Sequence, residues 1–289
     1  MVKLKISNKI FLAFFCLSFV SFACLHAFGS DIAIYGDSQH NPEIQRRLVQ
    51  TILSFKPAIV FRVGDIVNDG YEPELWKAFH DIHGPLLETT EYFPALGNHE
   101  YDSPLYFDTF RFLNNRRWYS VDRMGIHFII LDSNSRLDLE SEQYKWLVSD
   151  LTAQEGSAKF VIAIFHHPIF DVGAYHKADE KNLRPILQPL FENAGVSAVF
   201  SGHSHNYQRF EYNGMYFIVT AGGGSNLRKQ SRTDPYLQKF SLSYHFCLLT
   251  PEDDFLRVRV IDIDSKLIDD FKIPAKVGNY ATINEETRN

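Results

Sequence analysis

Two histidines lie one residue apart directly after an apolar run in the second half of the chain. Residues 196–200 are mostly apolar, and His203 and His205 follow Gly202. Neutral imidazoles at this spacing suit borderline metals such as Zn, Mn or Fe. A His-x-His pair alone is weak support for a metal site, because many such pairs are surface or core histidines.

Four apolar runs upstream also end in polar residues. Their polar residues are Asp37, Asp65, Asn98 with His99, and His166 with His167. If the runs are parallel strands, their carboxyl ends meet at one edge of a sheet, where open α/β proteins bind ligands. Two carboxylates, an amide oxygen and three or more imidazoles exceed the needs of one tetrahedral ion. They suit two adjacent metals that share a carboxylate, ~3.5–4 Å apart, an arrangement that promotes in-line displacement at phosphorus.

The first half of the chain predicts the elements that position the upstream residues. Apolar runs at residues 31–36, 58–63 and 92–96 alternate with a helix that begins at Asn41-Pro42 and a helix at 73–87. We expect Asn41 to be the N-cap, with Pro42 in the first turn. This β-α-β-α-β order predicts a largely parallel sheet with right-handed crossovers.

The second half predicts a more antiparallel arrangement within the same domain. Asn213-Gly214 is a strong hairpin signal between two apolar runs. The expected strands are two within residues 118–132, then 160–165, 196–200, 210–212, 215–220, 244–250, 256–263 and 267–273, and the expected helices are 140–152 and 184–193.

The N-terminus indicates export. Three lysines among the first nine residues precede an apolar run at 10–27, which ends in Ala27-Phe28-Gly29. Residues 1–29 are therefore predicted to be a signal peptide, with an uncleaved membrane anchor as the alternative. We expect a domain at 30–274, a polar tail at 275–289, and a protein that is secreted or periplasmic, or anchored to a membrane.

The net charge argues against one class of function, and the cysteine content argues against internal disulfides. The net charge of −6 argues against a general nucleic-acid binder, which is usually basic. Cys16 and Cys24 fall within the predicted signal peptide, which leaves Cys247 as the single cysteine of the mature chain. An internal disulfide is therefore not expected.

Five short blocks, in order, resemble the calcineurin-like metallophosphoesterases, most closely their purple-acid-phosphatase-like and bacterial phosphohydrolase branches. The blocks are Gly36-Asp37, Gly64-Asp65, Gly97-Asn98-His99-Glu100, His166-His167-Pro168 and Gly202-His203-Ser204-His205. Any one block is a weak signal, whereas five in order are specific. The resemblance implies an α/β fold with a two-sheet β-sandwich flanked by helices in four layers. The site would lie at one edge of the sheets.

The resemblance also implies a dinuclear centre of Fe, Mn or Zn. Asp65 would bridge the two metals. Asp37 and His205 would complete one metal site, and Asn98, His166 and His203 would complete the other. His166 is preferred to His167 because the family pattern is His-x-Pro.

Catalysis would then depend on His99 and a hydroxide held between the metals. His99 would protonate the leaving alkoxide or stabilise the transition state, and the hydroxide would be the nucleophile. Candidate substrate contacts are Asn68, Tyr101, Tyr207 and Arg209, and the last two are equally compatible with ordinary strand positions. His176 is interpreted as a solvated loop histidine.

Two residues depart from the family pattern. Gln39 stands where much of the family has a metal-binding histidine, so the first metal site is expected to have one protein ligand fewer. Asn68 stands where purple acid phosphatases have a tyrosine and other branches often have an aspartate. A purple iron–tyrosinate centre is therefore not expected, although Asn68 has the hydrogen-bonding capacity to orient His99.

These features predict an exported, metal-dependent phosphoesterase that acts on a small-molecule phosphate ester, with monoesters favoured. A phosphodiesterase, acting on cyclic nucleotides or other diesters, is the nearest alternative. A non-catalytic binding module with a degraded metal site is the alternative from another class. The histidine at position 99 argues against it, because a degraded site has no reason to keep an acid beside intact ligands.

Overall fold

The first three strands of the chain lie parallel because helices connect them. The computed structural model describes residues 30–154 and 156–275. In it α1 (Pro42–Ser54) and α2 (Pro73–Thr89) are the crossovers between β1 (Ile32–Tyr35), β2 (Ile59–Arg62) and β3 (Glu91–Pro94). The predicted β-α-β-α-β order is confirmed.

The first sheet has six strands. Three strands from the end of the described chain add to β1, β2 and β3, and they pair with one another and with β1 in antiparallel fashion. They are β11 (His245–Pro251), β12 (Phe255–Asp262) and β13 (Leu267–Pro274). The order across the sheet is β13-β12-β11-β1-β2-β3, and β11 pairs with β1 in antiparallel fashion.

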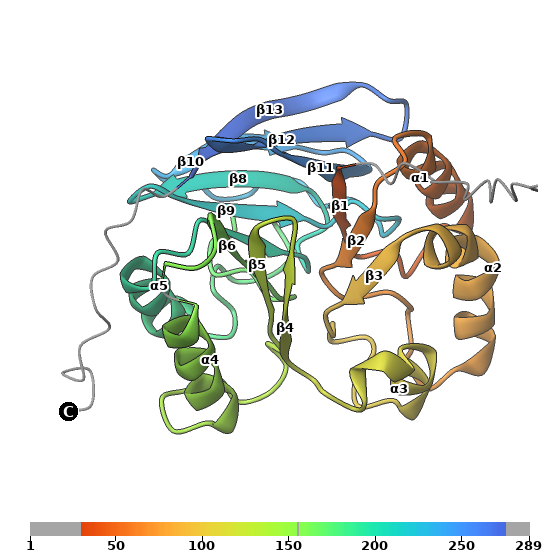
Figure 1. Ribbon diagram of the computed structural model, residues 1–289. Coiled ribbons are helices and arrows are strands. Elements are labelled where there is room, and N and C mark those ends of the chain that lie inside the picture. The colour runs from red at the N-terminus through yellow and green to blue at the C-terminus, as the bar shows by residue number, and fades with distance from the viewer. Residues whose placement is uncertain (1–29, 155, 276–289) are drawn as a thin grey trace, which may run out of the picture.

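The second sheet has seven strands in the order β10-β8-β9-β7-β6-β5-β4. Its strands are β4 (Tyr119–Arg123), β5 (Ile126–Ile130), β6 (Phe160–Ile164), β7 (Ala198–Ser201), β8 (Tyr207–Tyr212), β9 (Met215–Thr220) and β10 (Leu237–Ser241). The remaining helices are α3 (Pro104–Thr109), η1 (Arg111–Leu113), α4 (Glu142–Ala153) and α5 (Arg184–Asn193). Helices flank both sheets (Figure 1), so the predicted four-layer sandwich is confirmed.

Strand β6 shows how the core is divided. Ile162 and Ile164 belong to the hydrophobic cluster that also contains β1, β2, α1 and α2. Val161 and Ala163 belong to a second cluster with α4 and α5. Because side chains alternate between the two faces of a strand, one continuous apolar run serves both interfaces.

Three elements of the described structure, α3, η1 and β10, were not predicted from the sequence. Helix α3 is only six residues long, and it begins where Ser103 Oγ accepts a hydrogen bond from the Leu105 N–H at 3.1 Å. Strand β10 lies at the edge of its sheet with no fully buried residue, so it lacks the apolar alternation that marks a strand.

The start of α1 differs from the prediction. Asn41 occupies the N-cap position, but its backbone is left-handed (φ 49°) and its side chain does not cap the helix. Instead, Asn41 Nδ2 donates a hydrogen bond to the Gly224 carbonyl at 2.7 Å. The residue therefore connects α1 to the loop that follows β9.

The ends of the chain carry two predictions that the structure does not address. The predicted signal peptide at 1–29 lies outside the described residues, as do residues 276–289 of the predicted polar tail. Within the described ranges, no helix has the length and apolar character needed to cross a membrane.

Candidate metal centre

The predicted ligands follow the carboxyl ends of strands from both sheets. Asp37 follows β1 and Asp65 follows β2, whereas His203 follows β7 in the other sheet. All three have positive backbone φ angles, of 58°, 51° and 69°. Such angles are uncommon for non-glycine residues and cluster at functional sites. The strain therefore supports a functional role for this edge.

Glu100 fixes the loops that carry the ligands. Its buried carboxylate accepts hydrogen bonds from the backbone N–H groups of Gly97 at 2.8 Å and Asp65 at 2.9 Å. It also accepts from Ile66 at 2.7 Å and Val67 at 3.2 Å. Burial raises the pKa of Glu100, while these four donors favour its charged form. The sequence contained Glu100 within a family block, but no role was predicted for it.

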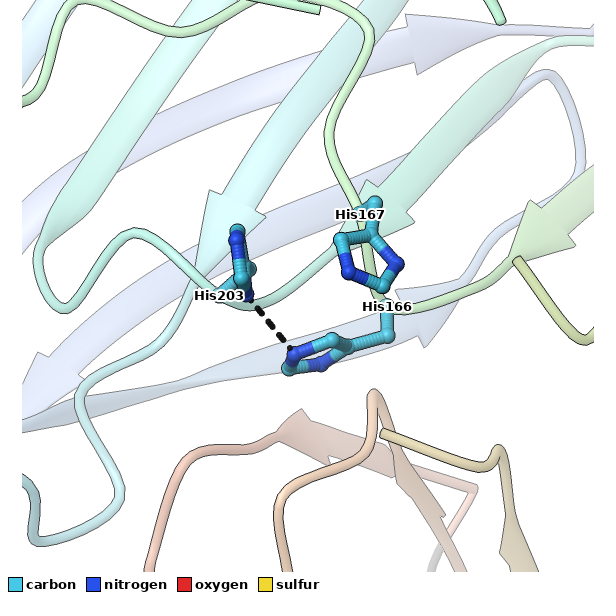
Figure 2. A group of neighbouring side chains, drawn as sticks. All are labelled: His166, His167 and His203. Atoms are coloured by element: carbon cyan, nitrogen blue, oxygen red, sulfur yellow. Dashed lines mark hydrogen bonds between the residues drawn. The ribbon is translucent and has the colours of Figure 1, made fainter. Parts of the chain in front are cut away.

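The first set of ligand atoms, which we call the histidine group, surrounds His166 Nε2. His166 Nδ1 donates to the Val63 carbonyl at 2.9 Å, so Nε2 of the neutral ring carries a lone pair. Asn98 Oδ1 lies 3.0 Å from that atom, His203 Nδ1 3.1 Å and Asp65 Oδ2 3.3 Å. Figure 2 shows the hydrogen bond between the His166 and His203 rings, which come from the loops after β6 and β7 and have an interplanar angle of 78°. Four lone-pair atoms that converge in this way fit a bound cation.

The second set, which we call the carboxylate group, consists of Asp37, Asp65 and His205. One ligand atom of each lies within 4.8 Å of the others. Asp37 Oδ1 accepts from the His203 backbone N–H at 2.8 Å, and Asp37 Oδ2 is buried without a hydrogen-bond partner among the described residues. His205 Nδ1 donates to the Asn226 carbonyl at 3.0 Å, which leaves Nε2 3.6 Å from Asp37 Oδ1. This group also fits a cation, with more oxygen and less nitrogen.

Gln39 contacts the carboxylate that the two groups share. Its Nε2 donates to Asp65 Oδ2 at 3.1 Å, while its Oε1 is buried and has no partner in the part of the chain described. The two ends of an amide are distinguished only by their hydrogen bonds. Gln39 therefore lies close enough to the shared carboxylate to affect any ion that it binds.

The electrostatic environment keeps most of the imidazoles neutral. Burial lowers the pKa of His203, and lowers that of His205 to about 4. His166 and Asp65 behave as a pair. Burial disfavours the charge on each, but their mutual attraction dominates, so the pKa of Asp65 is lowered and that of His166 is raised to about 9. A metal at this position must displace the proton held by that pair.

Comparison with known proteins identifies the family. The sequence profile of the calcineurin-like phosphoesterases matches residues 30–207. The chain belongs to this family. Its curated relatives include purple acid phosphatase 22 of Arabidopsis thaliana, 31% identical over 186 residues. That match covers 56% of this chain and 43% of the relative, so the chain spans less than half the length of that protein.

Two solved structures share the fold. The purple acid phosphatase of yellow lupin (Lupinus luteus) seeds superposes with a TM-score of 0.74 at 19% identity, over 84% of this chain and 53% of that one. GAP50 of Plasmodium, described as the anchor in the inner membrane complex, gives a TM-score of 0.70 at 18% identity, over 89% and 92% of the two chains. The same fold thus carries a phosphatase and an anchor, so activity has to be inferred from the site.

The predicted acid of this calcineurin-like site is held beside the shared carboxylate. His99 Nδ1 donates to the Asn68 carbonyl at 2.7 Å, and the His99 backbone N–H donates to Asp65 Oδ1 at 3.1 Å. His99 Nε2 lies 3.9 Å from Asp65 Oδ2, and the side chain is 30% exposed. The Asn68 side chain is itself exposed, so Asn68 orients His99 through its backbone carbonyl.

His167 is close to the site but has another partner. Ser133 Oγ accepts from the His167 backbone N–H at 3.0 Å and pairs with His167 Nδ1 at 2.8 Å. The His167 ring also lies near His166 and His203 (Figure 2). Burial lowers the pKa of His167 to about 2. The geometry supports His166 as the ligand of this pair.

Sequence reasoning missed a contact between the loop after β6 and His203. His176 Nδ1 lies 3.0 Å from Glu180 Oε2, and His203 Nε2 lies 3.5 Å from the same oxygen. The rings of His176 and His203 have centroids 3.6 Å apart. His176 is therefore not a solvated loop residue as interpreted, and the i, i+4 spacing of His176 and Glu180 was the available signal.

The structure separates the four candidate substrate contacts. Tyr101 and Asn98 line one cavity, and Asn68 contacts His99 as described. Tyr207 is fully buried in β8 and donates to Asp269 at 2.9 Å. Arg209 pairs with the same carboxylate at 2.8 Å. Both take structural roles, because β8 begins at Tyr207 and directs them toward β13.

Proposed function

We propose that this protein is a metal-dependent phosphoesterase with a two-metal site. The observation that carries the proposal is that two groups of lone-pair atoms converge on a shared carboxylate, Asp65. The proposed ligands are Asp37, Asp65, Asn98, His166, His203 and His205, with Fe, Mn or Zn as the metals. A buried carboxylate oxygen without a hydrogen-bond partner, Asp37 Oδ2, adds to the unmet need for a cation among the described residues.

The residues around the metals have distinct tasks. Bound metals would activate water at neutral pH and stabilise charge on the phosphoryl oxygens. His99 keeps its Nδ1–H on the Asn68 carbonyl, so the protonated ring presents Nε2–H for transfer to the leaving oxygen. Glu100 holds the loops of Asp65 and Asn98 at a fixed separation.

Phosphate monoesters are the proposed substrates, and the exported compartments are the proposed location. The curated relatives named as acid phosphatases support monoesters. The lysine-led apolar segment at residues 1–29 supports export. A phosphodiesterase activity is distinguished by experiment below.

The test is turnover of p-nitrophenyl phosphate and bis-p-nitrophenyl phosphate by metal-stripped protein reloaded with Mn, Zn or Fe. Turnover should require metal, favour the monoester, and fall sharply in Asp65→Ala and His99→Ala. His80→Ala, which removes an exposed histidine on α2, is the control and should keep full activity. A preference for the diester would replace the monoesterase assignment. Folded protein without turnover in any metal would overturn the enzyme proposal in favour of a binding module.

A further inference from the structure

A cavity of about 810 Å³ opens beside the proposed metal centre. Asn98, a member of the histidine group, lines one end of it, and Asn134 donates from its side chain to the Gly97 carbonyl at 3.2 Å. This volume lies in the range of sites that enclose small organic ligands. An ester whose phosphate sits at the metal groups can therefore extend its alcohol part into this cavity.

An exposed aromatic ring forms one wall. Tyr101 is 52% exposed, in a left-handed backbone conformation (φ 52°) two residues after His99. Its ring is backed by Tyr71, with centroids 6.4 Å apart and an interplanar angle of 29°. Trp118 also lines the cavity. A half-exposed ring backed by a second ring is a surface on which a planar ligand stacks.

The charges of the wall disfavour an anionic occupant. Arg117 pairs with Asp132 at 2.7 Å and also with Asp102. Arg136, the other cation of the lining, pairs with Asp138. Both guanidinium groups are thus engaged by carboxylates. Of the lining residues, two are cationic and three are acidic (Asp102, Glu140 and Glu142), so a second phosphate gains little here.

We infer that this cavity is the leaving-group subsite and takes a nucleoside, so that the preferred substrates are nucleoside monophosphates. This inference rests on the proposed phosphoesterase function. A nucleoside offers a planar ring for Tyr101, no charge of its own, and hydroxyl groups that donate to the carboxylates of the wall. Nucleoside di- and triphosphates place their extra charge against the acidic side of the wall and are poorer substrates.

The test compares kcat/KM for adenosine 5′-monophosphate, glycerol 2-phosphate and ATP in the metal-loaded protein. Stacking on one ring predicts a preference of about tenfold for the nucleoside monophosphate over glycerol phosphate. Tyr101→Ala should abolish that preference by raising KM for adenosine 5′-monophosphate more than KM for glycerol 2-phosphate, and Tyr101→Phe should retain the preference. Phe112→Ala is the matched control, because Phe112 is also 52% exposed but does not line the cavity.

Equal kcat/KM for the two monoesters, or an equal loss for both in Tyr101→Ala, would overturn the subsite. Calorimetric titration with adenosine separates this failure from failure of the proposed function. If no ester is hydrolysed but adenosine binds and Tyr101→Ala weakens it about tenfold, the subsite stands without the enzyme. If esters are hydrolysed but adenosine neither binds nor inhibits, the enzyme stands without the subsite.

Discussion

The histidine group and the carboxylate group share Asp65 but differ in what surrounds it. In the histidine group, an amide oxygen and a second imidazole nitrogen lie within 3.1 Å of His166 Nε2, and Asp65 Oδ2 lies 3.3 Å from it. The carboxylate group has two carboxylates, one imidazole and Gln39 in place of a further nitrogen ligand. Nitrogen-rich sites suit Zn, and oxygen-rich sites suit harder ions such as Mn. In the proposed two-metal site, Asp65 would thus be shared by two ions that differ in type and in binding strength.

Removing one imidazole from each group is expected to have the largest effect, and it tests whether the two groups bind metal with different strength. We expect His166→Ala and His205→Ala each to lower kcat by on the order of 10³-fold, because loss of an ion removes several kcal/mol of charge stabilisation. Mass spectrometry of dialysed protein should find that His205→Ala keeps about one ion per chain and His166→Ala fewer. Equal retention of metal by the two variants would show that the groups bind with equal strength.

The support behind the carboxylate group should depend on pH. His245 lies 3.2 Å from Thr220 Oγ1, and the Thr220 carbonyl accepts from Gly36, the residue before Asp37. Burial lowers the pKa of His245 from 6.5 to about 4. The unfolded chain therefore takes up the proton first, and about 3 kcal/mol of stability, fully present above pH 6.5, is lost as the pH falls toward 4.

Urea unfolding of metal-free protein between pH 7 and 4 measures this loss. The stability of His245→Asn should fall less steeply with decreasing pH than that of the wild type. Absolute stability also changes through the lost hydrogen bonds, so the slope is the diagnostic quantity. Parallel curves for the two proteins would exclude His245 as the group responsible.

Gln39→His should make the carboxylate group more similar to the histidine group, because it adds a nitrogen ligand. A nitrogen ligand beside Asp65 is expected to increase the affinity of the weaker ion about tenfold, or about 1.4 kcal/mol. Isothermal titration with Zn would detect the change as a merging of two binding phases. Gln238→His, an exposed position on β10, controls for an added histidine elsewhere. An unchanged weak phase would mean that position 39 does not reach the ion.

Local sequence predicted most of the elements and the candidate ligand positions, because both follow short-range rules. The apolar runs before Asp37 and Asp65 identify buried parallel strands, and the strand ends bring the ligands to one edge. The role of Glu100 was not predictable, since it depends on backbone N–H groups of two loops. Tyr207 shows that closeness to a ligand in sequence does not place a side chain in the site. It lies two residues from His205 in sequence, yet strand β8 turns it toward Asp269.

Because four backbone N–H groups donate to Glu100, the loops of the site keep their arrangement whether or not metal is bound. In a zinc finger the ion supplies the folding energy, so its removal unfolds the chain. Here a carboxylate of the protein holds the same loops from behind. Metals bound by the proposed ligands would therefore be exchangeable, because the protein itself holds the loops in place. If the chain is exported as proposed, it would fold without metal and start its chemistry in the compartment where metal is supplied.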